Sequence, residues 1–408
     1  MTPARKIPGL LVTDREHTVP LDHAAPGGET LTVFTREVAA IGGEDRPYLL
    51  FLQGGPGFEA ARPIAPPTGW QKRALKDYRL LLLDQRGTGR SSPVGTIPGD
   101  TADAQTAYLT HFRADSIVRD AELIRQELDV DRWSLLGQSF GGFCTMTYLS
   151  FFPEALREAY ITGGLSPIGR PVDDVYAATY ARMRERNRAY FERYPDDRAV
   201  VREIFRRLEN EDVRLPSGDR LTPARFRQVG MPFGMSDGFE RVNGILELPF
   251  GSPAFLHDVE QSSPFARNPL YATVHESCYA DGGSTRWSGD RLLPDEFLSE
   301  GYFTGEHIVR SMWQDIGGLR PHQEAAEALA EHTWDRLYDA DRLAHNEVPV
   351  AATIYVDDPY VVREFAEETA RQIRGLRPWI TNEYLHDGLR QGGEKLLGRL
   401  IDLAKGMI

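Results

Sequence analysis

The spacing of apolar and polar residues divides the chain into three parts. In the first part, strand-like apolar runs alternate with stretches whose apolar residues recur every three or four positions, the spacing of an amphipathic helix. This predicts strands at residues 31–38, 48–52, 78–83, 133–136 and 159–162, and helices at residues 114–128 and 143–152. Strands and helices that alternate in this way predict a mostly parallel sheet with helices on both faces.

The middle part, from about residue 166 to residue 346, is rich in Arg, Glu and aromatic residues and has few strand-like runs. It predicts helices at residues 176–194 and 198–208, and the alternation then resumes with strands at 348–356 and 378–381 and helices at 361–371 and 394–404. We therefore expect an α/β catalytic domain, residues 1–165 and 347–408, with a large, mainly helical cap inserted as residues 166–346. The cap should cover the carboxyl ends of the strands, where such sheets bind ligands.

Composition and charge narrow the class of protein. The 408 residues are 41% hydrophobic and 26% charged, as in ordinary globular proteins, and the formal net charge of -13 argues against a nucleic-acid partner. No stretch approaches the roughly 18 apolar residues of a membrane helix, and residues 1–20 lack the apolar core of a signal peptide. Two cysteines imply no disulfide framework. These features favour a soluble cytoplasmic protein and leave its oligomeric state open.

A Gly-x-Ser-x-Gly pattern, Gly137-Gln-Ser-Phe-Gly141, lies between a predicted strand and a predicted helix. This context is that of the nucleophile elbow of the α/β-hydrolase fold, in which a tight turn presents a serine hydroxyl above the sheet. Glycines flank the serine because side chains there would collide with neighbouring backbone. We therefore expect Ser139 to be a nucleophile and the amide of Phe140 to be one donor of an oxyanion hole.

A second glycine-rich turn, Gln53-Gly-Gly-Pro-Gly57, also follows a predicted strand. Hydrolases of this fold take the other oxyanion donor from such a turn, where glycine lets the backbone approach the reacting atoms. The expected donor is the amide of Gly55, with Gly54 as a possible alternative.

The rest of a catalytic triad is expected in the chain order serine, acid, histidine. Asp357 and Asp358 follow the strand predicted at residues 348–356, and His386 is the only one of the ten histidines that comes after them. We favour Asp358 as the acid because it places the strand in better register, and Asp357 remains the alternative. No cluster of His, Cys and acidic residues has the spacing of metal ligands, so no metal or other cofactor is expected.

Together these motifs resemble those of the proline iminopeptidase (prolyl aminopeptidase) family, in its larger bacterial form, over nearly the whole chain. The shared segments are Gly54-Gly-Pro-Gly57, Asp84-Gln-Arg-Gly-Thr-Gly-Arg-Ser91, Gly137-Gln-Ser-Phe-Gly-Gly142 and Tyr384-Leu-His-Asp-Gly-Leu-Arg390. The chain departs from the common family pattern at three places. It has Gln53 where the family usually has His, Phe140 where it often has Trp, and Tyr355-Val-Asp-Asp358 where it often has Gly-Arg-Tyr-Asp.

The resemblance implies an enzyme that releases an N-terminal proline from short peptides through an acyl-enzyme. It also implies that carboxylates of the cap bind the substrate amine, and Glu276 and Glu306 match by local motif. A proline ring also needs an apolar slot, for which the candidates are Phe140, Phe143, Tyr279 and Phe303. Two alternatives remain: an esterase or amidase for small non-peptide substrates, which shares the triad and the fold, and a catalytically silent hydrolase fold that only binds partners.

Overall fold

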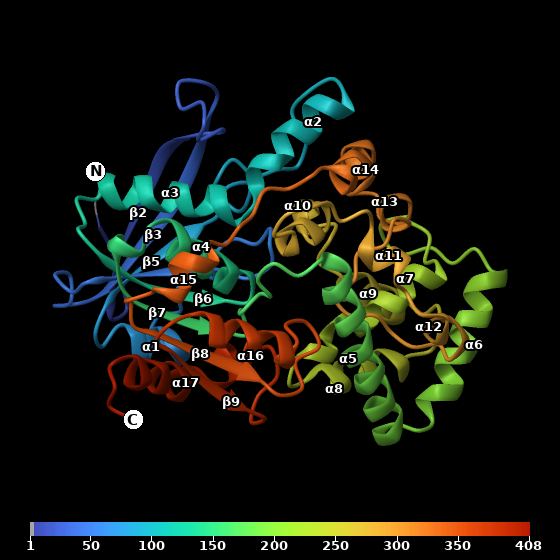
Figure 1. Ribbon diagram of the computed structural model, residues 1–408. Helices are drawn as coiled ribbons and strands as arrows, with labels where there is room; N and C mark the ends of the chain where they lie inside the picture. Colours follow the sequence, from blue (N-terminus) through green and yellow to red (C-terminus); the bar gives the residue numbers. More distant parts are fainter. Residues whose placement is uncertain (1–3) are drawn as a thin grey trace.

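A nine-stranded sheet forms the centre of the left-hand lobe of the molecule in Figure 1. The structure is a computed structural model and describes residues 4–408. In the sheet the strands lie in the order β1-β2-β3-β5-β4-β6-β7-β8-β9. Their bounds are β1 (Arg5–Ile7), β2 (Leu10–Pro20), β3 (Thr30–Ala40), β4 (Tyr48–Leu52), β5 (Arg79–Asp84), β6 (Trp133–Gln138), β7 (Leu156–Thr162), β8 (Val350–Tyr355) and β9 (Leu376–Thr381).

From β5 to β9 the neighbouring strands are parallel, whereas the pairs β1–β2, β2–β3 and β3–β5 are antiparallel. The mostly parallel sheet predicted from the sequence is therefore confirmed, but the first predicted strand began only at residue 31 and β2 was missed. The reason is that β2 lies towards the sheet edge and carries Asp14, Arg15 and Glu16 in succession, so it has no apolar run. It nevertheless pairs along its whole length, from Leu10 opposite Ala40 onwards.

Helices cover both faces of the sheet because side chains alternate between the faces along each strand. In β5, Leu80 and Leu82 pack with the cluster that includes α1 and α17, whereas Leu81 and Leu83 pack with the cluster that includes α3 and α4. In Figure 1, α3 lies above the sheet and α17 below it. The helices of this lobe are α1 (Gly69–Ala74), α2 (Ala102–Leu109), α3 (Ala114–Glu127), α4 (Phe140–Phe151), α16 (Arg363–Gln372) and α17 (Gly388–Ala404), with 3₁₀ turns η1 (Thr110–Phe112) and η2 (Pro153–Ala155).

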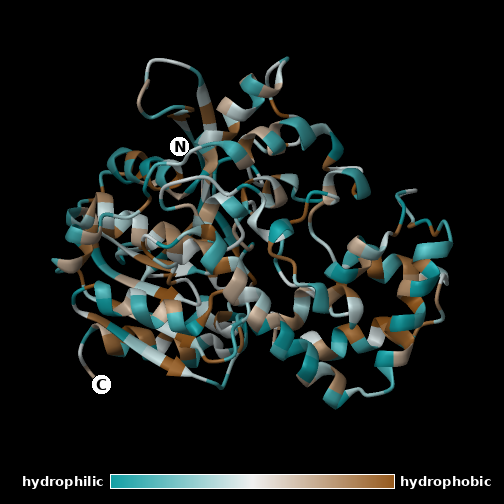
Figure 2. Cartoon of the chain, turned by 45° about the vertical axis from the view of Figure 1, so that its right-hand side comes forward, coloured by the Kyte–Doolittle hydropathy of each residue, from teal (hydrophilic) through white to brown (hydrophobic). Residues whose placement is uncertain are grey.

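The segment between β7 and β8 is mainly helical. Most of it forms the right-hand part of Figure 1, whereas its last helix lies beside α4 in the left-hand lobe. In Figure 2 its helices carry hydrophobic and hydrophilic stretches side by side, as amphipathic helices do. Its α-helices are α5 (Val172–Arg193), α6 (Asp197–Asn210), α7 (Pro223–Arg227), α8 (Gly238–Leu246), α9 (Pro253–Gln261), α10 (Pro269–Val274), α11 (Ser288–Arg291), α12 (Asp295–Ser299), α13 (Met312–Asp315), α14 (Gln323–Glu331) and α15 (Ala340–Ala344). Its 3₁₀ turns are η3 (Gln228–Gly234), η4 (Glu276–Tyr279) and η5 (Arg320–His322).

The insertion is not packed as one separate unit. Part of it, including α6 to α9, has its own apolar cluster, whereas Leu270, Tyr279 and Leu337 belong to the same cluster as the sheet. The buried Arg113, at the start of α3, donates hydrogen bonds to the carbonyls of Ala280 (2.7 Å) and Asp335. The division of the chain at residues 166 and 346 thus stays a prediction, and the second half of the insertion is anchored on the α/β lobe.

No helix among residues 4–408 combines the length and the apolar content that crossing a bilayer requires.

Candidate active site

Ser139 lies at the turn between β6 and α4 in a backbone conformation that is rare for a residue with a side chain. Its φ is 55° and its ψ is -124°, and it immediately precedes the first residue of α4. The flanking glycines are required by space, because a Cβ on Gly137 would clash with the carbonyl of Gly141, and one on Gly141 with the carbonyl of Leu52. The turn therefore holds the Ser139 side chain at the end of the parallel strands, as a nucleophile elbow does.

The structure brings Ser139, His386 and Asp358 together in a continuous hydrogen-bonded chain. His386 Nε2 lies 2.8 Å from Ser139 Oγ, and His386 Nδ1 lies 2.7 Å from Asp358 Oδ2. Because an ionised carboxylate can only accept, Nδ1 carries the proton and Nε2 is free to accept one from the serine hydroxyl. All three side chains are buried, with exposed fractions of 8%, 3% and 0%.

Asp358 is fixed by its other oxygen, Oδ1, which accepts hydrogen bonds from the amides of Tyr360 (2.9 Å) and Val361 (3.1 Å). Asp357, the alternative acid, is exposed, and the structure does not bring it to the imidazole of His386. The two aspartates are adjacent in the sequence, but their side chains point in different directions, and only that of Asp358 reaches His386.

The charges around His386 favour its protonated form. Burial of the ring lowers the pKa of His386, but the charge of Asp358, the hydrogen bond to it and the charge of Glu306 together raise the pKa above its ordinary value. A neutral histidine with a raised pKa is a stronger base, and the same charges stabilise the imidazolium that forms during nucleophilic attack.

The glycine-rich turn after β4 lies against the serine. A Cβ on Gly54 would be 3.0 Å from the Cβ of Ser139, so only glycine lets the turn approach this closely. Phe140 is the first residue of α4, and its amide therefore has no acceptor within the helix. The amides of Phe140 and of Gly54 or Gly55 are thus the groups near Ser139 that could bind an oxyanion.

The family motif after β5 supports this turn from behind. The side-chain amide of Gln85 donates to the carbonyl of Gln53 at 2.9 Å, and the buried Asp84 binds the guanidinium of Arg62 at 3.0 Å and the amide of Ala60 at 3.1 Å. The motif therefore positions the segment on which the second oxyanion donor is expected, a role that the sequence did not indicate.

Above Ser139 opens a cavity of about 690 Å³, within the range of small-molecule and peptide sites. The α/β lobe contributes the turn after β4, Ser139 and His386, and the cap contributes residues of η3, α8, α9 and α10 together with Glu306. A substrate thus reaches Ser139 through a cavity that residues of the cap line on one side.

Glu306 is the predicted carboxylate that the structure brings to this cavity. Its Oε1 accepts a hydrogen bond from the hydroxyl of Tyr271 at 2.6 Å, and its Oε2 lies 3.8 Å from Nε2 of His275. Burial by itself raises the pKa of Glu306, but the interaction with His275, the charge of His386 and the hydrogen bond from Tyr271 outweigh it and lower the pKa. Within residues 4–408, no Arg or Lys forms an ion pair with this carboxylate.

Glu276, the other predicted carboxylate, is not in the wall of this cavity. It begins η4, is buried, and accepts a hydrogen bond from the amide of Gly289 at 2.8 Å, on the side of the cap that contains α11. Burial is the largest influence and raises the pKa of Glu276. The two glutamates that matched by motif therefore have different surroundings, and only Glu306 shares a cavity with Ser139.

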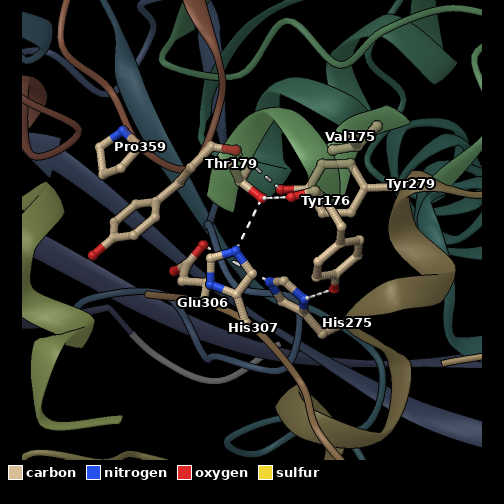
Figure 3. A pocket seen from close by; sticks show the side chains of 9 residues that line it. Val175, Tyr176, Thr179, His275, Tyr279, Glu306, His307 and Pro359 are labelled. Carbon is tan, nitrogen blue, oxygen red and sulfur yellow. Dashed lines mark hydrogen bonds and ion pairs between the residues drawn. The ribbon is translucent and has the colours of Figure 1, made fainter. Parts of the chain in front are cut away.

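A second, narrow cavity of about 10 Å³ adjoins Glu306 (Figure 3). Its apolar walls are Val175, Tyr279, Pro359 and the ring of Tyr360. Of the aromatic residues considered for a proline slot, Tyr279 lines this cavity. The other three are buried elsewhere: Phe140 and Phe143 pack against each other with ring centres 6.0 Å apart, and Phe303 lies in the apolar cluster of the cap.

Tyr271 and His275 were not among the site residues predicted from the sequence, although a signal was present. Tyr271 lies in α10 and His275 is the residue that caps its C-terminus. They are four residues apart, so they lie on one face of the helix. Glu276, the next residue, is turned by about 100° from His275 and faces elsewhere.

Among residues 4–408 no group of three or more His, Cys, Asp or Glu side chains has the arrangement of a metal site.

Comparison with known proteins identifies the family. A model of the alpha/beta hydrolase fold matches residues 47–231. A proline iminopeptidase of Aeromonas sobria is 48% identical over 403 residues, which cover 95% of this chain and 95% of that protein. The chain belongs to the proline iminopeptidase family.

A further family member, from Aspergillus aculeatus, is 33% identical over 420 residues, covering 96% of this chain and 93% of that protein. The crystal structure of a proline iminopeptidase from Mycobacterium smegmatis covers 96% of this chain and 98% of that chain, with 15% identity and a TM-score of 0.49. The family and the α/β-hydrolase fold predicted from the sequence are confirmed by the family model and the two sequence relatives.

Proposed function

We propose that this protein is a serine aminopeptidase that releases an N-terminal proline from peptides. The observation that carries this proposal is Glu306, a largely buried carboxylate without an Arg or Lys partner among the described residues, in the same cavity as Ser139. A buried negative charge is costly unless a cation accompanies it, so such a carboxylate is suited to bind the charged amine of a substrate. The membership of the proline iminopeptidase family supports the same substrate.

The hydrolysis proceeds through an acyl-enzyme. With the substrate amine on Glu306, Oγ of Ser139 attacks the prolyl carbonyl carbon while Nε2 of His386 takes the hydroxyl proton. Asp358 stabilises the imidazolium, and the amides of Phe140 and Gly55, with Gly54 as the alternative, bind the oxyanion. His386 then gives its proton to the leaving amine, and a water molecule, activated by the same histidine, hydrolyses the prolyl ester and frees the serine.

The proline ring is accepted in the larger cavity beside Glu306, because the narrow cavity has a volume of only about 10 Å³, room for little more than a water molecule. The larger cavity offers apolar contacts to a five-membered ring from Phe58, Met231 and Tyr271, and Glu306 is part of its wall. Because both the ring and the amine must be placed at once, the site favours an N-terminal residue over an internal one. This assignment supports peptides, rather than simple esters, as the natural substrates.

The rest of the peptide extends through the larger cavity towards α8 and α9. There the lining is polar and includes Arg241, Asp258 and Gln261, so it can accompany a peptide backbone beyond the scissile bond. We place the enzyme in the cytoplasm, where peptides are degraded, because its two cysteines, Cys144 and Cys278, are buried free thiols.

The test compares three substrates of the purified enzyme: a proline arylamide, the same arylamide with an acetylated amine, and a simple aryl ester. We expect the free proline arylamide to be hydrolysed fastest, and acetylation to abolish its hydrolysis because the amide nitrogen can no longer pair with Glu306. The Ser139→Ala variant is the matched control for background hydrolysis. A folded enzyme that hydrolyses the ester but no aminoacyl arylamide would instead be an esterase, and failure of a fluorophosphonate to label Ser139 would indicate a silent hydrolase fold.

A further inference from the structure

The Glu306 carboxylate is held from behind by one face of α10 and its last residue. The hydroxyl of Tyr271 donates a hydrogen bond to Oε1 at 2.6 Å, and Nε2 of His275 lies 3.8 Å from Oε2. Both side chains are almost fully buried, with exposed fractions of 1% and 2%. The carboxylate thus has two fixed neighbours on the cap side, while its other side faces the cavity of Ser139.

The orientation of the His275 ring is fixed at its other nitrogen. Nδ1 lies 3.1 Å from the hydroxyl of Tyr176, which is buried and has no other hydrogen-bond partner among residues 4–408. Tyr176 therefore donates to Nδ1 when the ring is neutral, and the ring proton is then on Nε2, which faces Glu306. When the ring is protonated, Nε2 carries a proton as well, so an N–H group faces the carboxylate in both states.

His307 lines the narrow cavity together with His275 but has a different environment (Figure 3). His307 accepts a hydrogen bond at Nδ1 from the amide of Gly305 and contacts the hydroxyl of Thr179 at 3.1 Å through Nε2. Burial, together with the charge of His275, lowers the pKa of His307 to about 3, so it stays neutral. Of the two buried histidines, only His275 is in contact with the carboxylate.

We infer that His275, oriented by Tyr176, is a positioning residue that keeps the Glu306 carboxylate ionised and directed at the substrate amine. This inference rests on the proposed function, because it assumes that Glu306 binds the amine. The titratable groups that surround Glu306 and His275 are Tyr176, Tyr271, Glu276, Cys278, Tyr279, His307, Tyr360 and His386.

Loss of the imidazole should weaken amine binding in a pH-dependent way. Burial favours a protonated Glu306, and His275 is the first of the groups that oppose it. Without His275 the pKa of Glu306 rises, so the carboxylate is protonated, and the amine unbound, over a wider acidic range. Ester hydrolysis, which needs no amine site, should not decrease.

The experiment measures binding and turnover separately. In the Ser139→Ala background, calorimetry gives the dissociation constant of prolinamide from acidic to neutral pH for enzymes with His275, His275→Phe and His275→Gln. We expect His275→Phe to weaken binding by roughly tenfold or more, most strongly at acidic pH, because it removes the polar ring whose Nε2 lies 3.8 Å from the carboxylate and opposes its protonation. His275→Gln keeps an N–H donor and should restore part of the affinity. In the active enzyme the same changes should raise KM for a proline arylamide more than they lower kcat.

The controls separate this inference from the proposed function. His345→Gln, at an exposed histidine directly after α15, should bind prolinamide as the parent does. If the Ser139→Ala parent does not bind prolinamide at all, the amine site itself is wrong and both proposals fall. If the parent binds but neither His275 variant changes the affinity, or if ester and arylamide hydrolysis fall by the same factor, His275 has only a structural role. If His275→Phe does not fold, His275→Gln decides by its pH profile.

Discussion

The most informative substitution in this enzyme is Glu306→Gln, because it removes a charge and little else. Glutamine has nearly the same shape and keeps an acceptor oxygen for the hydroxyl of Tyr271. The substrate amine, in contrast, loses the carboxylate with which we propose that it pairs. We therefore expect a selective loss of activity towards aminoacyl substrates.

The size of this loss follows from the surroundings of Glu306, whose side chain is 16% exposed. A hydrogen bond to a charged group contributes about 1.5–3 kcal/mol, and 1.36 kcal/mol corresponds to a factor of ten in rate. The expected fall in kcat/KM for a proline arylamide is therefore roughly 10- to 150-fold.

The same substitution should preserve or increase ester hydrolysis at acidic pH, in contrast to the loss expected for the proline arylamide. The negative charge of Glu306 contributes to the raised pKa of His386, so its removal lowers that pKa. Because only neutral His386 can take the serine proton, the acidic limb of ester hydrolysis should move to lower pH. At mildly acidic pH the variant could therefore match or exceed the parent with a simple ester.

The assay is a pair of kcat/KM measurements on one preparation, with a proline arylamide and an aryl ester, at several pH values. The ratio of the two constants cancels errors in active-site concentration. A ratio equal to that of the parent, with both activities reduced, would refute the reasoning, since Glu306 would then support the fold and not the substrate amine.

Three further predictions concern the triad and the second glutamate. Ser139→Ala should lower turnover by about 10⁶-fold and leave the melting temperature nearly unchanged, as kinetics and calorimetry can show. Asp358→Asn should lower kcat by about 10⁴-fold, whereas Asp357→Asn, at an exposed side chain, should have little effect. The pKa of Glu276 is raised by burial, so its protonated form favours the fold and this stabilisation is lost as pH rises through that pKa. Glu276→Gln should accordingly gain in melting temperature relative to the parent from acidic to neutral pH, and an equal difference at all pH values would contradict this.

The central sheet could be predicted because parallel strands are apolar on both faces. All five residues of β4 and all six of β8 are buried, so these strands stand out as uninterrupted apolar runs. β2 could not be found in this way, because one side of it meets solvent and its polar residues hide the alternation. The helical cap was expected from its periodicity, but a pattern along the chain does not reveal that residues such as Tyr279 join the core of the sheet.

The candidate site was predictable to the extent that it depends on chain order and turns. The spacing of the glycines indicates Ser139, and the order of residues along the chain indicates His386. Both signals depend on the course of the backbone and not on the direction of a side chain. The choice between Asp357 and Asp358, and between Glu276 and Glu306, depends on the direction of a side chain. Neighbouring residues in a loop or helix differ in direction and not in local composition, so only the three-dimensional structure separates them.

The two lobes contribute different parts of the chemistry. Ser139 and His386 come from the ends of the parallel strands and would serve any acyl transfer, whereas Glu306 comes from the cap and makes the site negative. That charge acts on two partners at once, since it attracts the substrate amine and raises the pKa of His386. When a cationic amine binds, it offsets the charge and leaves His386 a less protonated, ready base. In the proposed function, substrate selection and activation of the nucleophile are therefore coupled through one carboxylate, and a residue of the cap thereby adapts a general hydrolase scaffold to the work of an aminopeptidase.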